Sequence, residues 1–330
     1  MKQDWTHDEL IEHWTLAPTE LVLLMNKSGA GRIGFAALLK FFQVEGRFPG
    51  SRSNVPETAV EYLLRQTRVA SSCWADYDWQ GRTIKYHRAE IRVLFGFREA
   101  TAEDSEAVMR WLHDHMFARE RHPERLREAA LQRFRELRLE PPTTERLDRL
   151  LGSALRNFEE QFSGTLLDRL SQWTKEALDA LLHLTNPEAT RVPLHDLRAD
   201  AGPVGIETLE EELSKLECLR NIELPPDLFN RLSAPIVQGY RRRVAIEEVH
   251  ELRRHPEAVR ITLLAAFCHL RTGELVDTLS DLLIDMVHRV AHRAEVKVDR
   301  ELIADFKRVS GKNNLLFKIA EASLDQPNHW

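Results

Sequence analysis

Apolar residues along this chain recur at intervals of three and four, which is the spacing of one face of an α-helix. No convincing run alternates apolar and polar residues, as a half-buried β-strand would. Clusters of Gly, Pro and Asn interrupt the helical pattern and indicate loops. The pattern therefore predicts an all-α protein, a multi-helix array. The expected helices cover residues 18–27, 31–45, 56–67, 82–95, 103–118, 123–138, 144–182, 206–218, 228–254, 257–270, 274–293 and 299–309.

Three parts are expected along the chain. Gly96-Phe97-Arg98 ends the first, a Pro- and Gly-rich stretch at 186–205 interrupts the second, and a further break falls within 224–240. Residues 328–330 follow the last predicted helix without another structural element, which is compatible with a chain cut from a longer protein. The expected parts, two helical modules and a helical scaffold segment, are residues 1–98, 99–235 and 236–330.

A first pair of helices, at 56–66 and 83–95, resembles a helix-turn-helix. The apolar face of the second helix holds Ile84, His87, Ile91, Leu94 and Phe95. Its opposite face holds Arg82, Lys85, Tyr86, Ala89 and Arg92. A DNA-recognition helix needs such an apolar back, with donors in front around a small residue that permits close approach to base edges. The connection at 67–82 is too long for a tight turn, and the pattern alone favours a solvated basic helix face.

A second pair has a tighter connection. A basic amphipathic helix at 125–137, which carries Arg125 and Arg127, is followed by a short connection, and Thr143 or Thr144 can cap the next helix. The buried face of that helix is expected to hold Leu147, Leu150, Leu151, Ala154 and Phe158. Its outward face holds Arg146, Arg149, Gly152, Ser153 and Arg156. Arginines beside Gly and Ser would let the backbone sit close to a groove. A recognition helix and an ordinary surface helix are about equally compatible with this pattern.

Composition and charge narrow the class of protein. The chain has 330 residues, 43% hydrophobic and 30% charged, with three isolated cysteines, no apolar run of membrane-spanning length and no secretory signal. These features predict a globular cytoplasmic protein that does not interact with membranes. Residues 1–158 carry 24 Lys and Arg against 23 Asp and Glu, whereas the remainder carries 22 against 29. The acidic excess lies in the C-terminal half, so the first half can present local basic faces.

Acidic and histidine residues on one predicted helix offer the strongest hint of a metal site. These are Asp277, Asp281, Asp285, His288 and His292. The opposite face of the same helix is apolar and holds Val276, Leu279, Leu283, Met286 and Val290. Two such stripes are typical of an amphipathic surface helix, and metal sites usually draw ligands from several elements. We therefore expect no catalytic residue, no metal site and no cofactor in this chain.

Several ordered blocks of residues extend over essentially the whole chain. They include Trp14 to Pro18, Gly31 to Ala36, Gly46 to Pro49, Gly81 to Lys85, Gly96 to Arg98, Pro141 to Thr143 with Arg146 and Leu147, Tyr240 to Arg243, and Leu302 to Lys307. Together, these blocks resemble transposases of the Tn-three family.

The resemblance implies a part of a DDE-type replicative transposase. Family members carry an acidic triad and two metal ions on an RNase H-like domain, which is expected beyond the residues present, so Mg²⁺ would belong to that domain. The family's N-terminal region recognises the terminal inverted repeats of the transposon in bacterial cytoplasm, and the blocks near 240 and 305 are expected to lead to a region that pairs two protomers. Both candidate recognition helices fall within matched blocks. Other interpretations remain open: a truncated relative that represses transposition, a region that contributes to strand cleavage, or a protein-binding helical scaffold.

Overall fold

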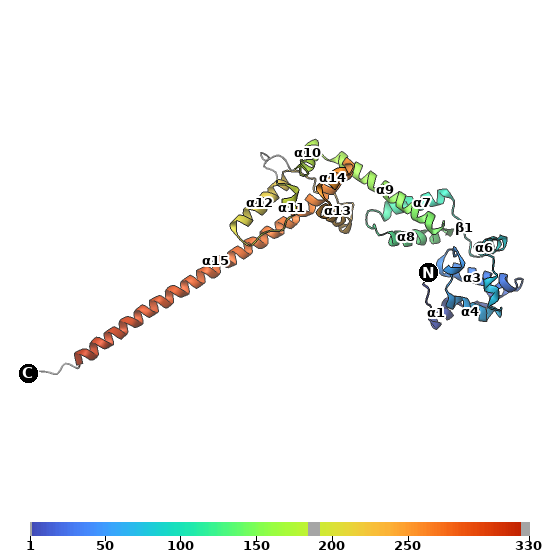
Figure 1. Ribbon diagram of the computed structural model, residues 1–330, viewed down its shortest axis with the longest axis horizontal. Helices are drawn as coiled ribbons and strands as arrows, with labels where there is room; N and C mark the ends of the chain where they lie inside the picture. Colours follow the sequence, from blue (N-terminus) through green and yellow to red (C-terminus); the bar gives the residue numbers. More distant parts are fainter. Residues whose placement is uncertain (1, 184–191, 325–330) are drawn as a thin grey trace, which may run out of the picture. The chain divides into compact units, whose positions relative to one another are not determined.

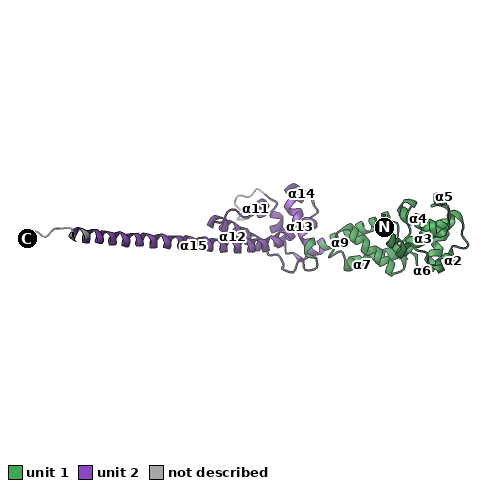
Figure 2. Ribbon diagram, turned by 90° about the horizontal axis from the view of Figure 1, so that it is seen from below, with its two compact units in different colours: residues 1–162, 231–236 green, residues 163–230, 237–330 purple. Residues whose placement is uncertain are grey.

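The computed structural model describes residues 2–183 and 192–324 (Figure 1), and the chain divides into two compact units. Unit 1 comprises residues 1–162 and 231–236, and unit 2 comprises residues 163–230 and 237–330 (Figure 2). The described part contains fifteen α-helices and a single pair of two-residue strands. The prediction of an all-α protein is confirmed, whereas the division into 1–98, 99–235 and 236–330 stays a prediction.

The first hydrophobic core of unit 1 surrounds one helix, α3. All residues from 33 to 42 of α3 are buried, and α1, α4, α5 and α6 pack around it. Gly34 allows α3 to approach Tyr77 closely, since a Cβ at that position would lie 2.2 Å from the Tyr77 ring. The elements of this part are α1 His7–Trp14, α2 Pro18–Leu23, α3 Gly29–Glu45, the 3-10 helix Arg52–Asn54, α4 Glu57–Thr67, α5 Ser72–Ala75 and α6 Arg82–Phe95.

A second hydrophobic core of unit 1 lies between α7, α8 and the start of α9. Val108, Leu112, Phe117, Phe134 and Leu147 are among its fully buried side chains. Strand β1 pairs in parallel with β2 at the edge of this core. The elements are β1 Arg98–Glu99, α7 Ala102–His115, α8 Pro123–Glu136, β2 Leu139–Glu140 and α9 Thr144–Arg169.

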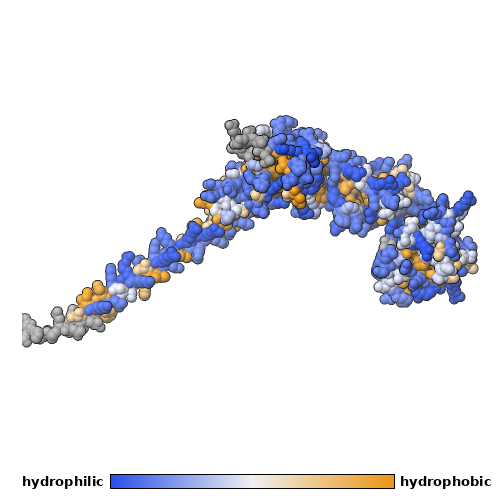
Figure 3. Space-filling model, in the orientation of Figure 1, coloured by the Kyte–Doolittle hydropathy of each residue, from blue (hydrophilic) through white to orange (hydrophobic). Residues whose placement is uncertain are grey.

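Unit 2 is organised around the first third of a long helix, α15, which packs against α10 and α12. Along α15, Leu282 is the last residue whose side chain is buried among the described residues. Beyond it, apolar residues such as Leu302 and Phe306 are exposed. Figure 3 shows hydrophobic patches, in orange, along this helix. The helices of this part are α10 Gln172–Ala180, α11 Leu194–Arg198, α12 Ile206–Arg220, α13 Ala234–Ile246, α14 Val249–Arg254 and α15 Glu257–Leu324.

Several predicted helix boundaries differ from the structure. The three helices expected between 257 and 309 form the single helix α15, because Gly273 costs only about 1 kcal/mol in a helix interior and no proline interrupts it. The single helix expected at 144–182 breaks into α9 and α10, where Ser171 caps the second helix. Likewise, the helix expected at 228–254 is divided into α13 and α14.

Short helices were also missed, because too few residues repeat for periodicity to be detected. These are α1, α5 and α11, the last within the loop expected at 186–205. Part of that loop and residues 328–330 lie outside the described residues. Of the apolar face expected around Leu279, only Leu279 itself is buried, since α15 is covered there on the side of Leu275, Leu279 and Leu282.

His87 links α6 to the first core and makes the stability of that core sensitive to pH. Its Nδ1 lies 2.9 Å from the Tyr77 hydroxyl, and its ring stacks on the Tyr77 ring. The His87 ring also makes an edge-to-face contact with the Phe35 ring. Burial lowers the pKa of His87 to about 4. Between that value and the ordinary value of about 6.5, the unfolded chain binds more protons than the folded chain, so acidification destabilises the fold.

We therefore expect the His87 contribution to lower the free energy of unfolding by about 2 kcal/mol between pH 7 and pH 5. Urea unfolding at both pH values gives the free energy of unfolding of the wild type and of His87→Phe. The His87 contribution is the difference between the two proteins in how much this free energy changes with pH. His122→Gln, at an exposed histidine, should retain the wild-type dependence. Equal pH dependence in the wild type and His87→Phe would contradict the assignment.

Candidate nucleic-acid interface

Local sequence sets both ends of α6. Before it, the Asp78 carboxylate accepts hydrogen bonds from the backbone N–H groups of Gln80 and Gly81, forming a tight turn. After it, Gly96 adopts a left-handed conformation with φ of 67°, and the Phe97 N–H donates to the Arg92 carbonyl. The helix therefore spans 82–95, as predicted.

The apolar side of α6 is buried through Ile84, His87 and Ile91, whereas Leu94, predicted on that face, is 47% exposed. Leu94 lies about 60° from the centre of the buried face, at its margin, so the first core does not cover it. The predicted buried face is thus correct at its centre and wrong at this edge.

Three of the cationic or small residues predicted on the outward face of α6 are exposed there: Arg82, Lys85 and Ala89. The Arg82 and Lys85 side chains form no hydrogen bond or ion pair with any described residue. Arg92 differs, since its side chain is only 15% exposed and its Nη1 lies 2.6 Å from Glu140 and 2.8 Å from Glu99. Arg92 therefore ties α6 to the strand pair instead of extending into solvent.

The helix α9 follows strand β2 after a three-residue connection and begins at Thr144, and the Leu147 N–H donates to the Thr143 carbonyl. Leu147 and Leu151 are buried in the second core. The other residues predicted on the apolar face, Leu150, Ala154 and Phe158, are half-buried against it.

The outward face of α9 carries the predicted cations. Arg146, Arg149, Ser153 and Arg156 are exposed, and Gly152 lies among them half-exposed. Arg149 donates only to the backbone carbonyl of Glu145, and Arg146 and Arg156 have no hydrogen-bond or ion-pair partner within the described part of the chain. These guanidinium groups are available to an anionic ligand.

The two arginines predicted on α8 have carboxylate partners. Arg127 makes a bidentate ion pair with Asp148 of α9, at 2.7 and 2.9 Å, and this pair raises the pKa of Arg127. Arg125 donates to Glu120 at 3.0 Å, but its side chain is 74% exposed. An exposed pair of this kind contributes little to stability and can exchange for another anion. Arg127 fixes α8 against α9, whereas Arg125 remains accessible.

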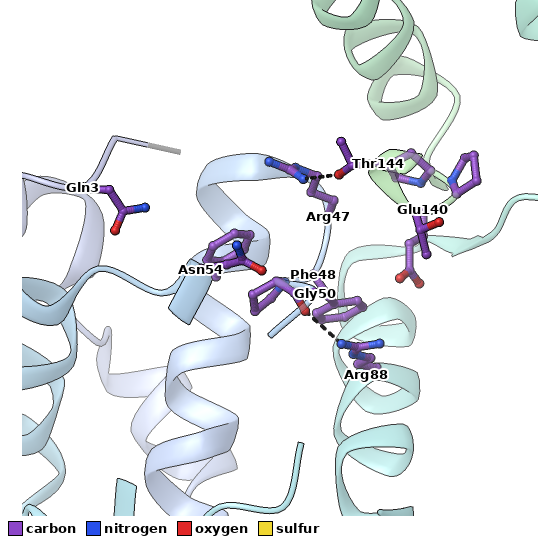
Figure 4. Close-up of a pocket in the computed structure, with 13 residues that line it drawn as sticks. Gln3, Arg47, Phe48, Gly50, Asn54, Arg88, Glu140 and Thr144 are labelled. Atoms are coloured by element: carbon purple, nitrogen blue, oxygen red, sulfur yellow. Dashed lines mark hydrogen bonds between the residues drawn. The ribbon is translucent and has the colours of Figure 1, made fainter. Parts of the chain in front are cut away.

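A polar joint holds the two cores of unit 1 together. Arg135 of α8 donates to the carbonyls of Gln43 and Val44 at the C-terminal end of α3, at 2.7 and 3.1 Å. A cation at this end of a helix also interacts favourably with the helix dipole. Arg47, in the loop after α3, donates to the hydroxyl of Thr144 at the start of α9, at 3.3 Å (Figure 4).

A cavity of about 280 Å³ lies within this joint, and Figure 4 shows Arg47, Arg88 and Glu140 around it. Arg88 donates to the Pro49 carbonyl at 2.9 Å and lies over the Phe48 ring. Burial raises the pKa of Glu140 and lowers the pKa of Arg88, so both charged forms depend on their partners. The joint therefore holds α6 and the start of α9 in a defined arrangement within one unit.

Sequence reasoning did not single out Arg47, Glu99 or Glu140 of this joint. Each is a single charged residue in a loop or short strand, and no local pattern marks its distant partner. The acidic stripe at Asp277, Asp281 and Asp285 is exposed along α15. Across residues 2–183 and 192–324, no cluster of three His, Cys, Asp or Glu side chains could hold a metal ion, and no helix is long and apolar enough to span a membrane.

Comparison with known proteins shows sequence similarity to transposases. Residues 1–154 match the family model described as a domain of unknown function, DUF4158. The chain is 23% identical over 329 residues to the transposase for transposon Tn3926 of Escherichia coli, covering 96% of this chain and 32% of that protein. It is also 23% identical over 321 residues to the transposase for transposon Tn501 of Pseudomonas aeruginosa, covering 97% and 32%.

A more distant relative matches a shorter stretch. The transposase for transposon Tn1546 of Enterococcus faecium is 23% identical over 247 residues, which is 74% of this chain and 25% of that protein. The chain thus spans about a third of the length of the first two relatives. Over nearly its whole length, the chain is similar to part of these transposases, in agreement with the resemblance of its sequence blocks.

The different environments of Arg92 and Arg82 lead to a stability prediction. Arg92→Ala leaves the half-buried Glu140 without its main cation and should lower the free energy of unfolding by about 2 kcal/mol. Arg82→Ala, on the same helix, removes an exposed unpaired cation and should change it by less than about 0.5 kcal/mol. Urea unfolding measures both, and the double variant Arg92→Ala/Glu140→Ala should lose less than the sum of its single variants. If Arg92→Ala and Arg82→Ala lower the free energy of unfolding by the same amount, the assignment of Arg92 to the joint is wrong.

Proposed function

We propose that this chain binds the terminal inverted repeats of a transposon as the N-terminal part of a DDE-type replicative transposase. The observation that carries the proposal is the pair of helices α6 and α9 in unit 1. Each buries an apolar face and presents unpaired Arg or Lys side chains opposite it. Such a face matches the requirements of a helix in the major groove, where cations neutralise phosphate and guanidinium groups reach base edges. The relatives, which are named as transposases, support DNA as the ligand.

The proposed contacts divide the predicted site residues into three roles. Arg92 and Arg127 position the recognition helices through their carboxylate partners. Thr144, at the start of α9, and the accessible Arg125 contact phosphates and set the register. The outward residues of the two helices meet the base edges of the groove or the phosphates beside it; they are Arg82, Lys85 and Ala89 of α6 and Arg146, Arg149, Gly152, Ser153 and Arg156 of α9.

In this proposal, residues 1–98 and 99–235 supply one recognition helix each, as two helix-turn-helix-like modules that follow successive major grooves. Residues 236–330 lead to the part of the transposase that pairs two protomers and cuts DNA in the bacterial cytoplasm, at the nucleoid. Strand cleavage and its Mg²⁺ ions belong to that further part. A cleavage assay on labelled transposon ends separates this proposal from a direct catalytic role, because the chain alone should leave the ends intact.

Binding should be specific and strongly dependent on salt. The affinity for a duplex carrying the inverted repeat should fall as salt rises, with a slope of log K against log salt of about −0.9 for each phosphate neutralised. Fluorescence anisotropy across a salt series measures the slope, and a scrambled duplex of equal length provides the control. Equal affinity for the scrambled duplex at physiological salt would overturn the proposed specificity, and a flat salt dependence would favour a protein-binding scaffold.

The outward face of α9 can be tested by substitutions that leave its core untouched. Arg149→Ala or Arg156→Ala should each cost about 1–3 kcal/mol of binding and relax discrimination at particular base pairs. Arg125→Ala should weaken specific and scrambled duplexes by a similar factor. Arg65→Ala, an exposed arginine on α4, serves as the matched control.

Gly152→Leu is the steric counterpart of these variants. A Cβ at this position would meet only the Arg156 guanidinium, at 3.6 Å, so the variant should keep its fold, and Leu is the better helix former. The added bulk should abolish DNA binding while circular dichroism shows unchanged helix content. Normal binding by Gly152→Leu would mean that α9 does not approach DNA on this face.

A further inference from the structure

The outward face of α6 carries an apolar line that the cationic residues alone do not explain. Tyr86 and Val93 are 71% and 80% exposed, and the exposed Ala89 lies between them. With Arg82, they follow the helical spacing i, i+4, i+7 and i+11. At about 100° per residue, this line lies opposite Ile84, His87 and Ile91, at the centre of the outward face. Single exposed apolar residues are common on protein surfaces, but these three lie in one line and form a continuous apolar surface.

Two charged side chains, one on each flank of this line, are held by partners. On one flank, Glu90 pairs with Lys27 at 3.0 Å. The Lys27 ammonium offsets the negative charge of the Glu90 carboxylate, which would otherwise repel a polyanion. On the other flank, Arg92 is held by Glu99 and Glu140. Arg82 and Lys85, at the N-terminal end of α6, remain exposed and unpaired with any described residue. The face therefore has two available cations at one end and an apolar surface along its centre.

This combination fits the major groove of duplex DNA. The thymine 5-methyl group is the apolar feature that base pairs present in that groove, and small or aromatic side chains are its usual contacts. Tyr86 and Val93 are seven residues apart, which is roughly 10 Å along a helix. That length corresponds to about three base pairs at roughly 3.4 Å each. Ala89, in the middle, permits close approach of the backbone.

We propose that Tyr86, Ala89 and Val93 form a thymine-reading surface on α6, with Arg82 and Lys85 bound to the neighbouring phosphates. The inference rests on the proposed function and adds the chemistry of recognition. It also distinguishes the two helices, because α9 presents Arg149, Ser153 and Arg156 on its outward face. The helix α9 would read hydrogen-bonding base edges, whereas α6 reads methyl groups, so the half of the site under α6 contains thymine.

Replacement of thymine by deoxyuridine tests this inference, because it removes only the methyl group. The preferred duplex is first selected from random sequences with the full chain, and each thymine is then replaced in turn. Anisotropy titrations should show an affinity loss of about fourfold for each methyl group that α6 contacts. Val93→Ala and Tyr86→Ala should each bind the thymine duplex more weakly and lose the sensitivity to uracil at one position.

Two control variants accompany these titrations. Arg82→Ala should weaken thymine and uracil duplexes by the same factor, since a phosphate contact does not sense the methyl group. Met25→Ala, at an apolar residue that is 77% exposed outside α6, should change neither affinity. Circular dichroism verifies that the substitutions, all at exposed positions, leave the fold intact.

The outcomes separate the inference from the proposed function. If the wild-type chain selects no duplex sequence, the proposed function fails, and the inference fails with it. If the wild type binds specifically but tolerates uracil at every position, or if Tyr86→Ala and Val93→Ala retain the uracil effect, only the inference fails. Light scattering measures self-association of the wild type and of Val93→Ala. If Val93→Ala loses self-association but keeps its DNA binding, the apolar line is a protein interface, and the inference is overturned.

Discussion

An amphipathic helix that buries its apolar side against a core must turn its other side to solvent, and this constraint orients both candidate recognition helices. In α6 the buried side is centred on Ile91, and in α9 it is centred on Leu147 and Leu151. Burial of each such side chain contributes roughly 1.5–3 kcal/mol, more than an exposed ion pair contributes. Apolar packing therefore decides the rotation of each helix, and the outward residues follow from it.

Within that frame, carboxylates determine which cations stay available. Arg92 lies on the flank of α6, where the strand pair brings Glu99 and Glu140 within ion-pair distance. Arg127 is similarly held by Asp148. Arg82 and Arg156 lie closer to the centre of the outward faces, where no described acidic residue reaches them. The numbers of acidic and basic residues in the first half of the chain are nearly equal. Local basic faces nevertheless remain, because the acidic partners lie away from the centres of the outward faces.

The proposed function depends on the joint between the two cores of unit 1. Three contacts connect segments far apart in the sequence: Arg135 of α8 with the end of α3, Arg47 with the start of α9, and Arg92 with Glu140. These contacts hold two outward helix faces within one compact unit. Recognition of a long DNA site by two helices benefits from such preorganisation, because fewer side chains and segments must be ordered on binding.

Local periodicity was sufficient to predict the all-α class, the bounds of α6, the start of α9 and the buried positions Ile84, Ile91, Leu147 and Leu151, because these depend on spacing within one helix. It was also sufficient to assign Arg149 and Arg156 to an exposed face. The engagement of Arg92, which the same periodicity assigned to an outward face, was decided by tertiary structure, because its partner Glu140 lies 48 residues away in the sequence. The exposure of Leu94 was likewise decided by which segments cover its helix, and periodicity within a helix carries no information about that covering.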